Sequence, residues 1–504
     1  MMKRLLPLLI LLSVHRLSSQ PLDQERLEEL ATTFTKSSFS TYRELLSIPS
    51  DAYYPDDIEL NVKWCEKAFQ KRNFVTTRIN TESVPLLLAE RQIDPKHKTV
   101  LIYLQLDGQP VDSSKWFQES PWIPVLKRQN EKGDWEQIPW ENIENYEDDW
   151  RVFARAAADA KGPVAMFLAA LDAIASRQLE PNFNMKVIMD FEEELGSPNL
   201  PQAVKDNSEL LSADMLIILD GPVHITNKPT LVFGARGIAQ IQLTTYGPVL
   251  PQHSGHYGNY APNPALRLSK LLASMKDDDG RVTIPGFYDG IHISEATEKI
   301  LKSVPDDEIE IRKRLQISKI DKVGSYYQEA IQYPSLNILG MQSGWVKEQT
   351  RTIIPNTAIA ELDIRLVQES DPQRLIGLVQ KHIENKGYHV IDREPNEEER
   401  LKYDKIATFT YKVYYRSFQT DFNTEVGQWL NRAYQRAFAR DPIRIRMGGG
   451  SIPISPFVTT LGIPAVLVTT VNSDNNQHSP NENLRLGNYR EGVKAMIAFL
   501  TEPL

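Results

Sequence analysis

Four unbroken runs of apolar residues occur along the chain, each about as long as a buried β-strand. The runs are TVLIYLQLD at 99–107, MKVIMDF at 185–191, MLIILD at 215–220 and IPAVLVTTV at 463–471. Runs without polar alternation are typical of strands that are covered on both faces. Helical stretches, such as PVAMFLAALDAIA from Pro163, separate several of them. The pattern therefore predicts an α/β domain.

The pattern changes at about Leu231, where alternating polar and apolar positions replace the unbroken runs. In GIAQIQLTT, the residues Ala239, Ile241 and Leu243 alternate with polar residues, and TAIAELDIRL at 357–366 repeats the alternation. Strands in which polar and apolar residues alternate belong to sheets with one face exposed to solvent. Helical stretches lie between such strands here. We therefore predict a separate α+β domain over residues 232–418, which divides residues 20–231 from residues 419–504.

Residues 1–19 have the layout of a secretory signal peptide. The opening MMKRLLPLLILLSVHRLSSQ combines a basic start, an apolar run from Leu5 to Val14 and small residues at Ser18 and Ser19. That run is too short for a stable membrane span, and no later segment approaches the roughly 20 apolar residues that a span requires. We expect an exported protein, periplasmic or extracellular, whose mature chain has no membrane span.

Composition narrows the classes of function. The 504-residue chain has a formal charge of −9, and its Lys and Arg residues are scattered, so it lacks the basic footprint of a nucleic-acid-binding protein. Cys65 is the only cysteine, which excludes a disulfide framework and a cysteine-based metal cage. Any metal ion must therefore be bound by His, Asp and Glu.

Carboxylates gather where the apolar runs end. Asp107 ends the first run, the acidic stretch at 190–194 follows the second, and Asp220 ends the third. Asp159 precedes a predicted helix, and His478 follows the fourth run. Ligands of open α/β sheets bind beyond the carboxyl ends of the strands, so these side chains should meet there. Converging carboxylates repel unless a cation holds them, and Asp, Glu and His suit zinc or a similar ion.

Each of these features also has an ordinary structural interpretation. An Asp before a helix is commonly an N-cap, and a lone histidine commonly lies in a surface loop. HSG at 253–255 and GGGS at 448–451 are, taken singly, typical of turns. Their joint occurrence in one chain favours a functional site.

Five motifs carry a resemblance to a known family. They are DAKGPV from Asp159, FEEELGSPN from Phe191, PQHSGHYG from Pro251, MGGGSIP from Met447 and HSPNEN from His478. From about residue 40 to its C-terminus, the chain resembles the zinc metallopeptidases that include carnosine dipeptidase, glutamate carboxypeptidase and aminoacylase. The resemblance implies a doubly wound mixed-sheet catalytic domain, zinc exopeptidase-like, with an inserted α+β lid that usually carries a dimer contact.

The resemblance also implies roles for the acidic residues of these motifs. Asp159 would bridge two metal ions, with Asp220 serving one of them and Glu194 and His478 the other. Glu193 would be the general base, which takes a proton from the attacking water and passes it to the departing amine. Of the paired glutamates, Glu194 would thus bind metal and Glu193 would transfer the proton.

Other residues of the implied site would orient the base or bind the substrate. Asp107 would orient the part of the site that contains the general base. His253 of the lid would stabilise the oxyanion, within its own chain or across a homodimer. Arg365 and the backbone around Gly450 and Ser451 would hold a substrate carboxylate, through a guanidinium fork and clustered N–H donors.

The chain departs from the family pattern at Gln105, where the family has a metal-binding histidine two residues before the aspartate of the first strand. His97 cannot substitute, because eight strand residues separate it by about 26 Å. An amide oxygen is a poorer ligand than imidazole, so Gln105 would be a weak ligand or none. We predict one tightly bound Zn²⁺ at the His478 side and a weaker one beside Asp220, with Mn²⁺ as an alternative.

These features predict an exported, metal-dependent hydrolase that cleaves the amide bond of short peptides, of the dipeptidase or carboxypeptidase type. Two alternatives stay open. One is a hydrolase of N-acyl amino acids with the same site, and the other, because of Gln105, is a pseudoenzyme that binds peptides. A serine hydrolase based on Ser451 is disfavoured, because no GxSxG elbow surrounds that serine.

Overall fold

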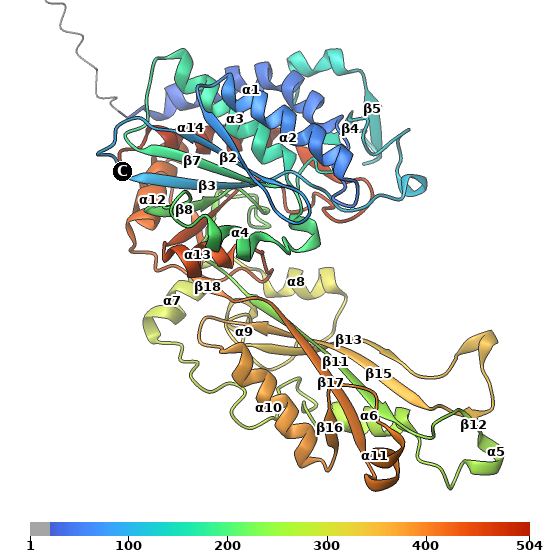
Figure 1. The fold of residues 1–504 in the computed structure, drawn as a ribbon. Helices are drawn as coiled ribbons and strands as arrows, with labels where there is room; N and C mark the ends of the chain where they lie inside the picture. The colour runs from blue at the N-terminus through green and yellow to red at the C-terminus, as the bar shows by residue number, and fades with distance from the viewer. Residues whose placement is uncertain (1–20) are drawn as a thin grey trace, which may run out of the picture.

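The computed structural model describes residues 21–504, which form two bodies, an upper and a lower one in Figure 1. The predicted signal peptide at residues 1–19 lies outside the described residues. The first helices and the last helix of the described chain both belong to the upper body, so the lower body is an insertion. Among the helices of residues 21–504, none is long and apolar enough to cross a membrane.

The upper body, here called the α/β body, is built on an eight-stranded mixed sheet. Its strand order is β1 (Val75–Ile79), β2 (Leu86–Arg91), β7 (Asn184–Asp190), β3 (Thr99–Gln105), β8 (Met215–Ile218), β20 (Ala465–Thr469), β9 (Thr230–Val232) and β19 (Ile443–Ile445). The central strands β7, β3, β8 and β20 are parallel neighbours and correspond to the four apolar runs. The predicted α/β class is therefore confirmed.

Burial on both faces explains why these runs lack polar alternation. On β3, Val100, Ile102 and Leu104 belong to the core on one side of the sheet, whereas Leu101 and Tyr103 belong to the core on the other. Each fully buried aliphatic side chain contributes about 1.5–3 kcal/mol through removal of apolar surface from water. A polar side chain at any of these positions would lose that contribution.

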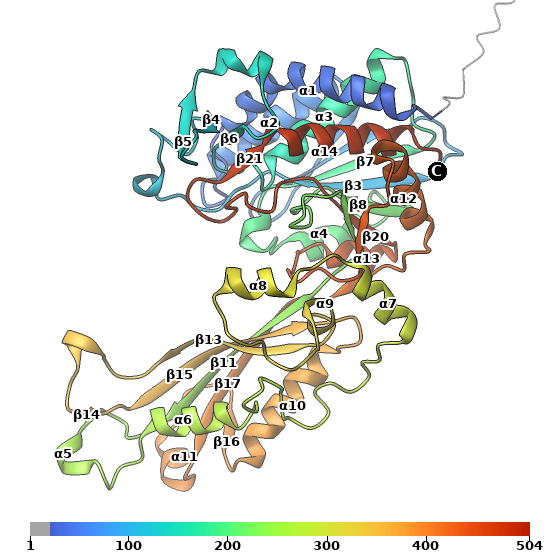
Figure 2. The ribbon, with the colours of Figure 1, turned by 180° about the vertical axis from the view of Figure 1, so that it is seen from behind.

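Helices cover both faces of the sheet, which makes this body doubly wound. One layer contains α1 (Gln24–Leu46), α2 (Pro55–Gln70), α3 (Lys161–Ser176), α12 (Glu425–Phe438) and α14 (Leu486–Thr501), and the other contains α4 (Leu200–Asp206) and α13 (Ser455–Leu461). Figures 1 and 2 show α1, α3 and α14 above the strands and α4 and α13 below them. Helix α3 is buried along most of its length, because α1 and α14 pack against it.

The lower body, the lid, is a five-stranded sheet with helices on one face. Its strand order is β13 (Ser335–Gln342), β15 (Thr357–Leu366), β11 (Gly237–Tyr246), β17 (Ile406–Tyr415) and β16 (His389–Ile391), and the covering helices are α6 (Pro264–Ala273) and α10 (Pro372–Asn385). Ala239, Ile241 and Leu243 belong to the core under these helices, whereas Gln242 is exposed. The predicted α+β class is confirmed, and the boundaries at 232 and 418 remain predictions.

Smaller elements flank and connect the two bodies. The sequence pattern does not predict the four-stranded sheet β21 (Asn483–Arg485), β6 (Arg151–Phe153), β4 (Val125–Gln129) and β5 (Trp135–Ile138). Two short pairs join β10 (Gly234–Ala235) to β18 (Phe418–Gln419) and β12 (Gln252–His253) to β14 (Ile353–Ile354). The remaining helices are α5 (Ser254–Tyr257), α7 (Glu295–Ser303), α8 (Glu308–Leu315), α9 (Tyr327–Ala330) and α11 (Glu397–Lys402), with 3₁₀ turns η1 (Ser113–Lys115), η2 (Trp140–Asn145), η3 (Glu193–Leu195) and η4 (Lys347–Gln349).

Candidate metal and catalytic site

The predicted acidic residues and the histidine meet at the carboxyl edge of the central strands. The turn η3, with Glu193 and Glu194, follows β7, and Asp220 follows β8. His478 lies in the loop after β20, and Asp159 lies in the loop before α3. Parallel strands end at one edge of a sheet, which brings these residues together although they are far apart in the sequence.

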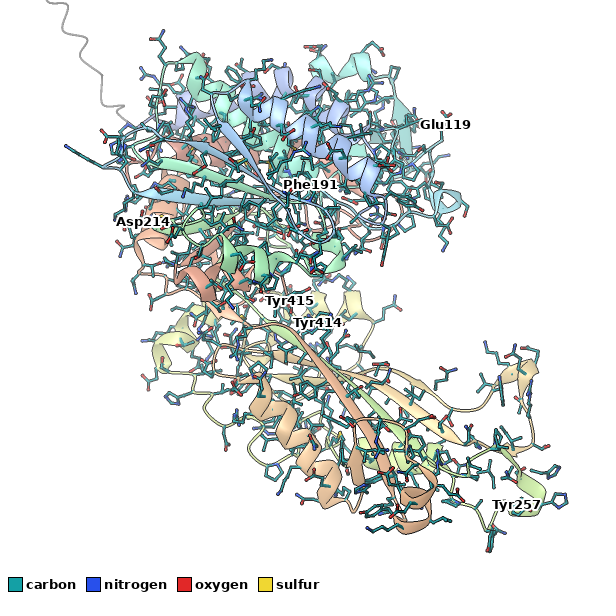
Figure 3. All side chains as sticks on the ribbon, in the orientation of Figure 1. Glu119, Phe191, Asp214, Tyr257, Tyr414 and Tyr415 are labelled. Atoms are coloured by element: carbon teal, nitrogen blue, oxygen red, sulfur yellow. The ribbon has the colours of Figure 1, made fainter. Side chains whose placement is uncertain are left out.

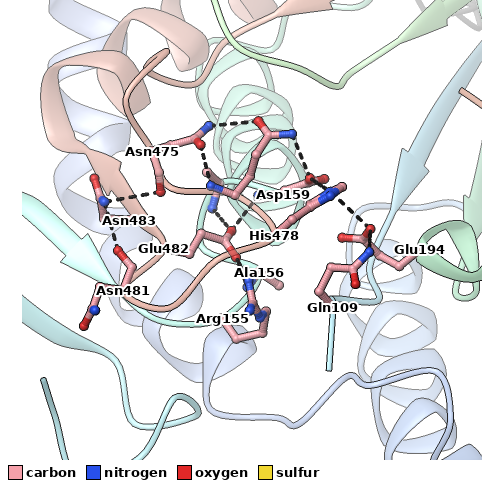
Figure 4. A network of polar contacts seen from close by, with 12 residues as sticks. Gln109, Arg155, Ala156, Asp159, Glu194, Asn475, His478, Asn481, Glu482 and Asn483 are labelled. Carbon is pink, nitrogen blue, oxygen red and sulfur yellow. Dashed lines mark hydrogen bonds and ion pairs between the residues drawn. The ribbon is translucent and has the colours of Figure 1, made fainter. Parts of the chain in front are cut away.

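Three of these residues place ligand atoms close enough to share one ion. His478 Nε2 lies 3.0 Å from Asp159 Oδ2 and 3.2 Å from Glu194 Oε2 (Figure 4). One potential ligand atom of each residue lies within 4.8 Å of the other two. Only 6% of Asp159 and 4% of the Glu194 side chain are exposed. One imidazole and two carboxylates form a donor set that fits zinc or another divalent cation.

Burial and mutual repulsion disfavour the ionised forms of the carboxylates in this site. Burial, and then the charge of Asp159, raise the pKa of Glu194 to about 8 and that of Asp220 to about 7. Burial, and then the charge of Asp220, raise the pKa of Glu193 well above its ordinary value. A hydrogen bond to Asp159 raises the pKa of His478 to about 9. Each shift favours the uptake of positive charge, which a divalent cation also supplies.

Gln105, the last residue of β3, contacts Asp159 through its amide nitrogen. Nε2 donates a hydrogen bond of 2.6 Å to Asp159 Oδ1. Oε1 is buried and has no hydrogen-bond partner among the described residues. A metal ligand must present the oxygen rather than the nitrogen, so a second ion here would compete with the bond to Asp159. This competition is a physical reason to expect a weak second site.

Hydrogen bonds from both bodies support the turn that carries the paired glutamates. Asp107, which is fully buried, accepts a hydrogen bond of 2.9 Å from the backbone N–H of Glu194. Gly196 closes the turn with φ of +82°, and its carbonyl accepts a hydrogen bond of 3.2 Å from Tyr415 of the lid strand β17. Figure 3 labels Tyr415 where the lid meets the α/β body. A Cβ atom at position 196 would overlap the Tyr415 hydroxyl, so glycine is required there.

The other two acids of this stretch have structural partners. Asp190 accepts hydrogen bonds from the hydroxyls of Tyr103 and Ser197, and Glu192 accepts one from the Asn199 amide. These bonds hold the chain between β7 and α4 in place. Neither carboxylate belongs to the cluster of potential metal ligands.

The lid contributes a cationic surface beside the loop at 448–451. Arg365 donates from Nη1 to Ser451 Oγ and from Nε to Asp363 Oδ2, each at 2.9 Å. The backbone N–H of Arg236 donates to the Gly450 carbonyl at 3.2 Å. The predicted substrate-binding residues are therefore neighbours. Arg236, which the sequence does not single out, is 8% exposed and forms no ion pair among the described residues.

Three further polar residues of the site are absent from the predicted set. Gln109 donates from Nε2 to Glu194 Oε2 at 2.7 Å, and Gln477 donates to Asp159 Oδ2 at 3.2 Å. Glu482 accepts hydrogen bonds from the loop that carries Asp159. The only signal in the sequence is their position in or beside LDGQP and NNQHSPNEN.

His253 does not join the other predicted site residues within one chain. It lies in β12, at the end of the lid that is farthest from the α/β body in Figures 1 and 2. Its side chain is exposed, and Nδ1 accepts a hydrogen bond of 3.0 Å from the Gly255 N–H. A role for His253 at the site would therefore have to come from a second chain.

A doubly wound body carries carboxylates and a histidine at its strand ends and is joined to an inserted lid, an arrangement that can bind a divalent cation and activate water for hydrolysis. Residues 125–502 match the model for peptidase family M20/M25/M40, and the chain belongs to this family. The resemblance carried by the sequence motifs is thereby confirmed.

Relatives and solved structures agree with this assignment. The chain is 26% identical to the Cys-Gly metallodipeptidase dug1 of Schizosaccharomyces pombe over 444 residues, 86% of either chain. It is 26% identical to the human Beta-Ala-His dipeptidase over 428 residues, 83% of this chain and 77% of the relative. The M20 family metallo-carboxypeptidase Sso-CP2 from Sulfolobus solfataricus has a TM-score of 0.76 at 26% identity, covering 92% of this chain and 98% of that one. Human carnosine dipeptidase 1 has the same fold, with a TM-score of 0.73 at 23% identity, covering 96% of this chain and 99% of that one.

The pKa shifts predict that the metal-free protein loses stability as the pH rises. The unfolded chain releases the protons of Asp220 and Glu194 near pH 4, whereas the folded protein keeps them until about pH 7 and about pH 8. The folded state therefore binds more protons in this interval, and the free energy of unfolding falls with increasing pH. His478 adds to this trend, because its contribution is lost as the pH rises through about 9.

Urea unfolding of the metal-free protein, followed by circular dichroism between pH values of about 5 and 8, measures this slope. Zinc-loaded protein is the control, because a bound cation takes the place of the protons and should remove or reverse the slope. Equal slopes with and without zinc would contradict the prediction.

Proposed function

We propose that the protein is an exported, zinc-dependent exopeptidase that hydrolyses dipeptides or similarly short peptides. The observation that carries this proposal is the cluster of Asp159, Glu194 and His478 beside the paired glutamate Glu193. Membership of the M20/M25/M40 family supports it, as do relatives named as a Cys-Gly metallodipeptidase and a Beta-Ala-His dipeptidase. The signal-like sequence at 1–19 supports export.

The residues of the site divide the steps of amide hydrolysis among them. A divalent cation, when bound by the cluster, would acidify water and polarise the substrate carbonyl. Glu193 accepts the proton of the attacking water and donates it to the departing amine. Burial, and then the charge of Asp220, raise the pKa of Glu193, so its carboxylate has a stronger tendency to take up a proton than an exposed glutamate has. Asp107 holds the turn on which Glu193 lies.

We expect the lid residues to favour substrates with a free carboxylate. Arg365 is held by Asp363 and Ser451, and the remaining N–H groups of its guanidinium suit a carboxylate. Arg236, without an ion-pair partner among the described residues, adds positive charge nearby. Binding of the substrate carboxylate by these residues would direct cleavage to a bond near that end of the peptide, as an exopeptidase requires.

We further propose a homodimer formed through the lid, in which His253 acts at the site of the other chain. Around His253, the apolar residues Val249, Leu250 and Tyr260 expose 69%, 65% and 87% of their surface. Exposed apolar surface of this kind is typical of a protein interface. An imidazole delivered by the second chain would stabilise the oxyanion that develops on the substrate.

Replacement of the proposed base tests the function directly. Glu193→Gln should lower kcat for dipeptide hydrolysis by about 10² or more, because the amide cannot accept the proton. Its zinc content should stay close to that of the natural protein, since Glu193 is not assigned to the metal. Glu192→Gln is the matched control and should keep both its activity and its zinc.

Several outcomes would change the proposal. Loss of zinc from Glu193→Gln would exchange the roles of Glu193 and Glu194. Faster hydrolysis of N-acyl amino acids than of dipeptides would make the protein an acyl-amino-acid hydrolase. Binding of peptides without hydrolysis by the zinc-loaded natural protein would identify a pseudoenzyme, and full activity after chelation would refute metal-dependent catalysis.

The proposed metal content is one tightly bound ion and one weakly bound ion, because Gln105 presents its amide nitrogen to Asp159. Gln105→His should raise the zinc affinity of the second site about 10- to 100-fold, provided that its other ring nitrogen finds a partner. Calorimetric zinc titration measures both sites, and Gln105→Leu is the control that removes the amide without adding a ligand. Two equally tight sites in the natural protein would contradict the weak second site.

Mixing two inactive variants tests the action of His253 across chains. His253→Ala and Glu193→Gln should each be inactive, but a mixed dimer contains one site with an intact base and an intact histidine. Co-refolded equal amounts should therefore recover about a quarter of the natural activity, since half of the dimers are mixed. Light scattering checks the dimer, and no recovery from a confirmed mixed dimer would confine any role of His253 to its own chain.

A further inference from the structure

A buried ion pair lies directly behind the metal-ligand cluster and has no part in the proposed chemistry. Arg155 Nη1 lies 2.8 Å from Glu482 Oε2, and only 3% and 1% of the two side chains are exposed. The net contribution of a buried pair to stability is commonly small, because desolvation offsets the attraction between the charges. Because the pair lies beside the metal-ligand cluster, it is placed to position the ligands.

The Glu482 carboxylate accepts three backbone hydrogen bonds in addition to the one from Arg155 (Figure 4). Oε1 accepts from the N–H groups of Ala158 and Asp159, both at 2.9 Å, and Oε2 accepts from the N–H of Ala156 at 3.1 Å. The loop before α3 therefore closes around a single carboxylate, and the backbone of Asp159 is one of its donors. A neutral amide has an acceptor at only one of its two ends, so it cannot replace all of these bonds.

Glu482 also belongs to the loop that carries the histidine of the cluster. It lies shortly after His478, between β20 and β21, and its carbonyl accepts a hydrogen bond of 3.2 Å from the Ala154 N–H. Asp159 and His478 thus lie on two loops that meet at this side chain. The two loops leave the ladder in which Asn483 of β21 pairs with Phe153 of β6, and the Glu482 side chain extends this link from the ladder to the backbone of Asp159.

We propose that Glu482 is a positioning residue for the metal site, which holds Asp159 and His478 at the separation that one shared ion requires. This inference rests on the proposed metal-dependent function. Replacement of a residue that hydrogen-bonds to the metal ligands typically lowers metal affinity about 10- to 100-fold. The reach of the Glu482 side chain is as important as its charge, because its four donors converge on two oxygen atoms.

Two substitutions of Glu482 distinguish the effect of its side-chain length from the effect of its charge. Glu482→Asp keeps the negative charge but withdraws it by one methylene group, whereas Glu482→Gln keeps the reach and removes the charge. Both should weaken zinc binding about 10- to 100-fold, measured by titration against a chromophoric chelator on protein whose circular dichroism shows that it is folded. A purely structural role would lower the melting temperature without changing the zinc affinity of the folded protein.

Arg155→Met is the matched control. It removes the other half of the ion pair but leaves the three backbone donors to Glu482, so its zinc affinity should stay close to that of the natural protein. Equal losses in Arg155→Met and Glu482→Asp would assign the effect to the ion pair and overturn the proposal.

Comparison of the two Glu482 variants shows whether reach matters in addition to charge. Natural zinc affinity in Glu482→Asp, with a loss only in Glu482→Gln, would mean that charge alone matters and would overturn the proposal. If Glu482→Gln does not fold, Glu482→Asp decides, because it retains the negative charge of the ion pair. A natural protein that binds no zinc would refute the proposed function as well, and the natural protein alone reveals that outcome.

Discussion

The burial of several carboxylates beside one another is the constraint on which the organisation of the site depends. Asp159, Glu193, Glu194 and Asp220 meet at one edge of the sheet, where burial and mutual repulsion both disfavour their ionised forms. His478 is the cationic side chain that lies among them. Four ionised carboxylates at this edge need more positive charge than one imidazolium can supply. Folding of this edge is therefore linked to the binding of protons or of a metal ion.

Hydrogen-bond donors around the carboxylates partly offset the cost of burying them. The side-chain amides of Gln105, Gln109 and Gln477 all donate to Asp159 or Glu194. Neutral donors reduce the cost of burial without cancelling the charge, so the site stays attractive to a cation. The arrangement also keeps each carboxylate in one orientation before any ion arrives, which is the condition for a defined metal geometry.

Burial that repeats along a strand can be predicted from the sequence, whereas contacts between distant loops cannot. β3 is apolar at nearly every position because both of its faces are covered, and β11 alternates because one face is open. The strands β21, β6, β4 and β5 are only three to five residues long, too short to show a period. The acids at strand ends are predictable from strand geometry. Glu482 is not, because its partners are mainly backbone N–H groups, which have no sequence signature, and Arg236 is identified only by its burial beside Gly450.

The chain passes between the two bodies twice, and the two passages are hydrogen-bonded to each other. Gly234 pairs with Gln419 and Ala235 pairs with Phe418, so both covalent connections of the lid run through one two-stranded ribbon. Tyr415 lies just before one of these connections and touches the turn that carries the paired glutamates. A change in the angle between the two bodies would strain or break this hydrogen bond, so the position of the proposed general base is coupled to the position of the lid.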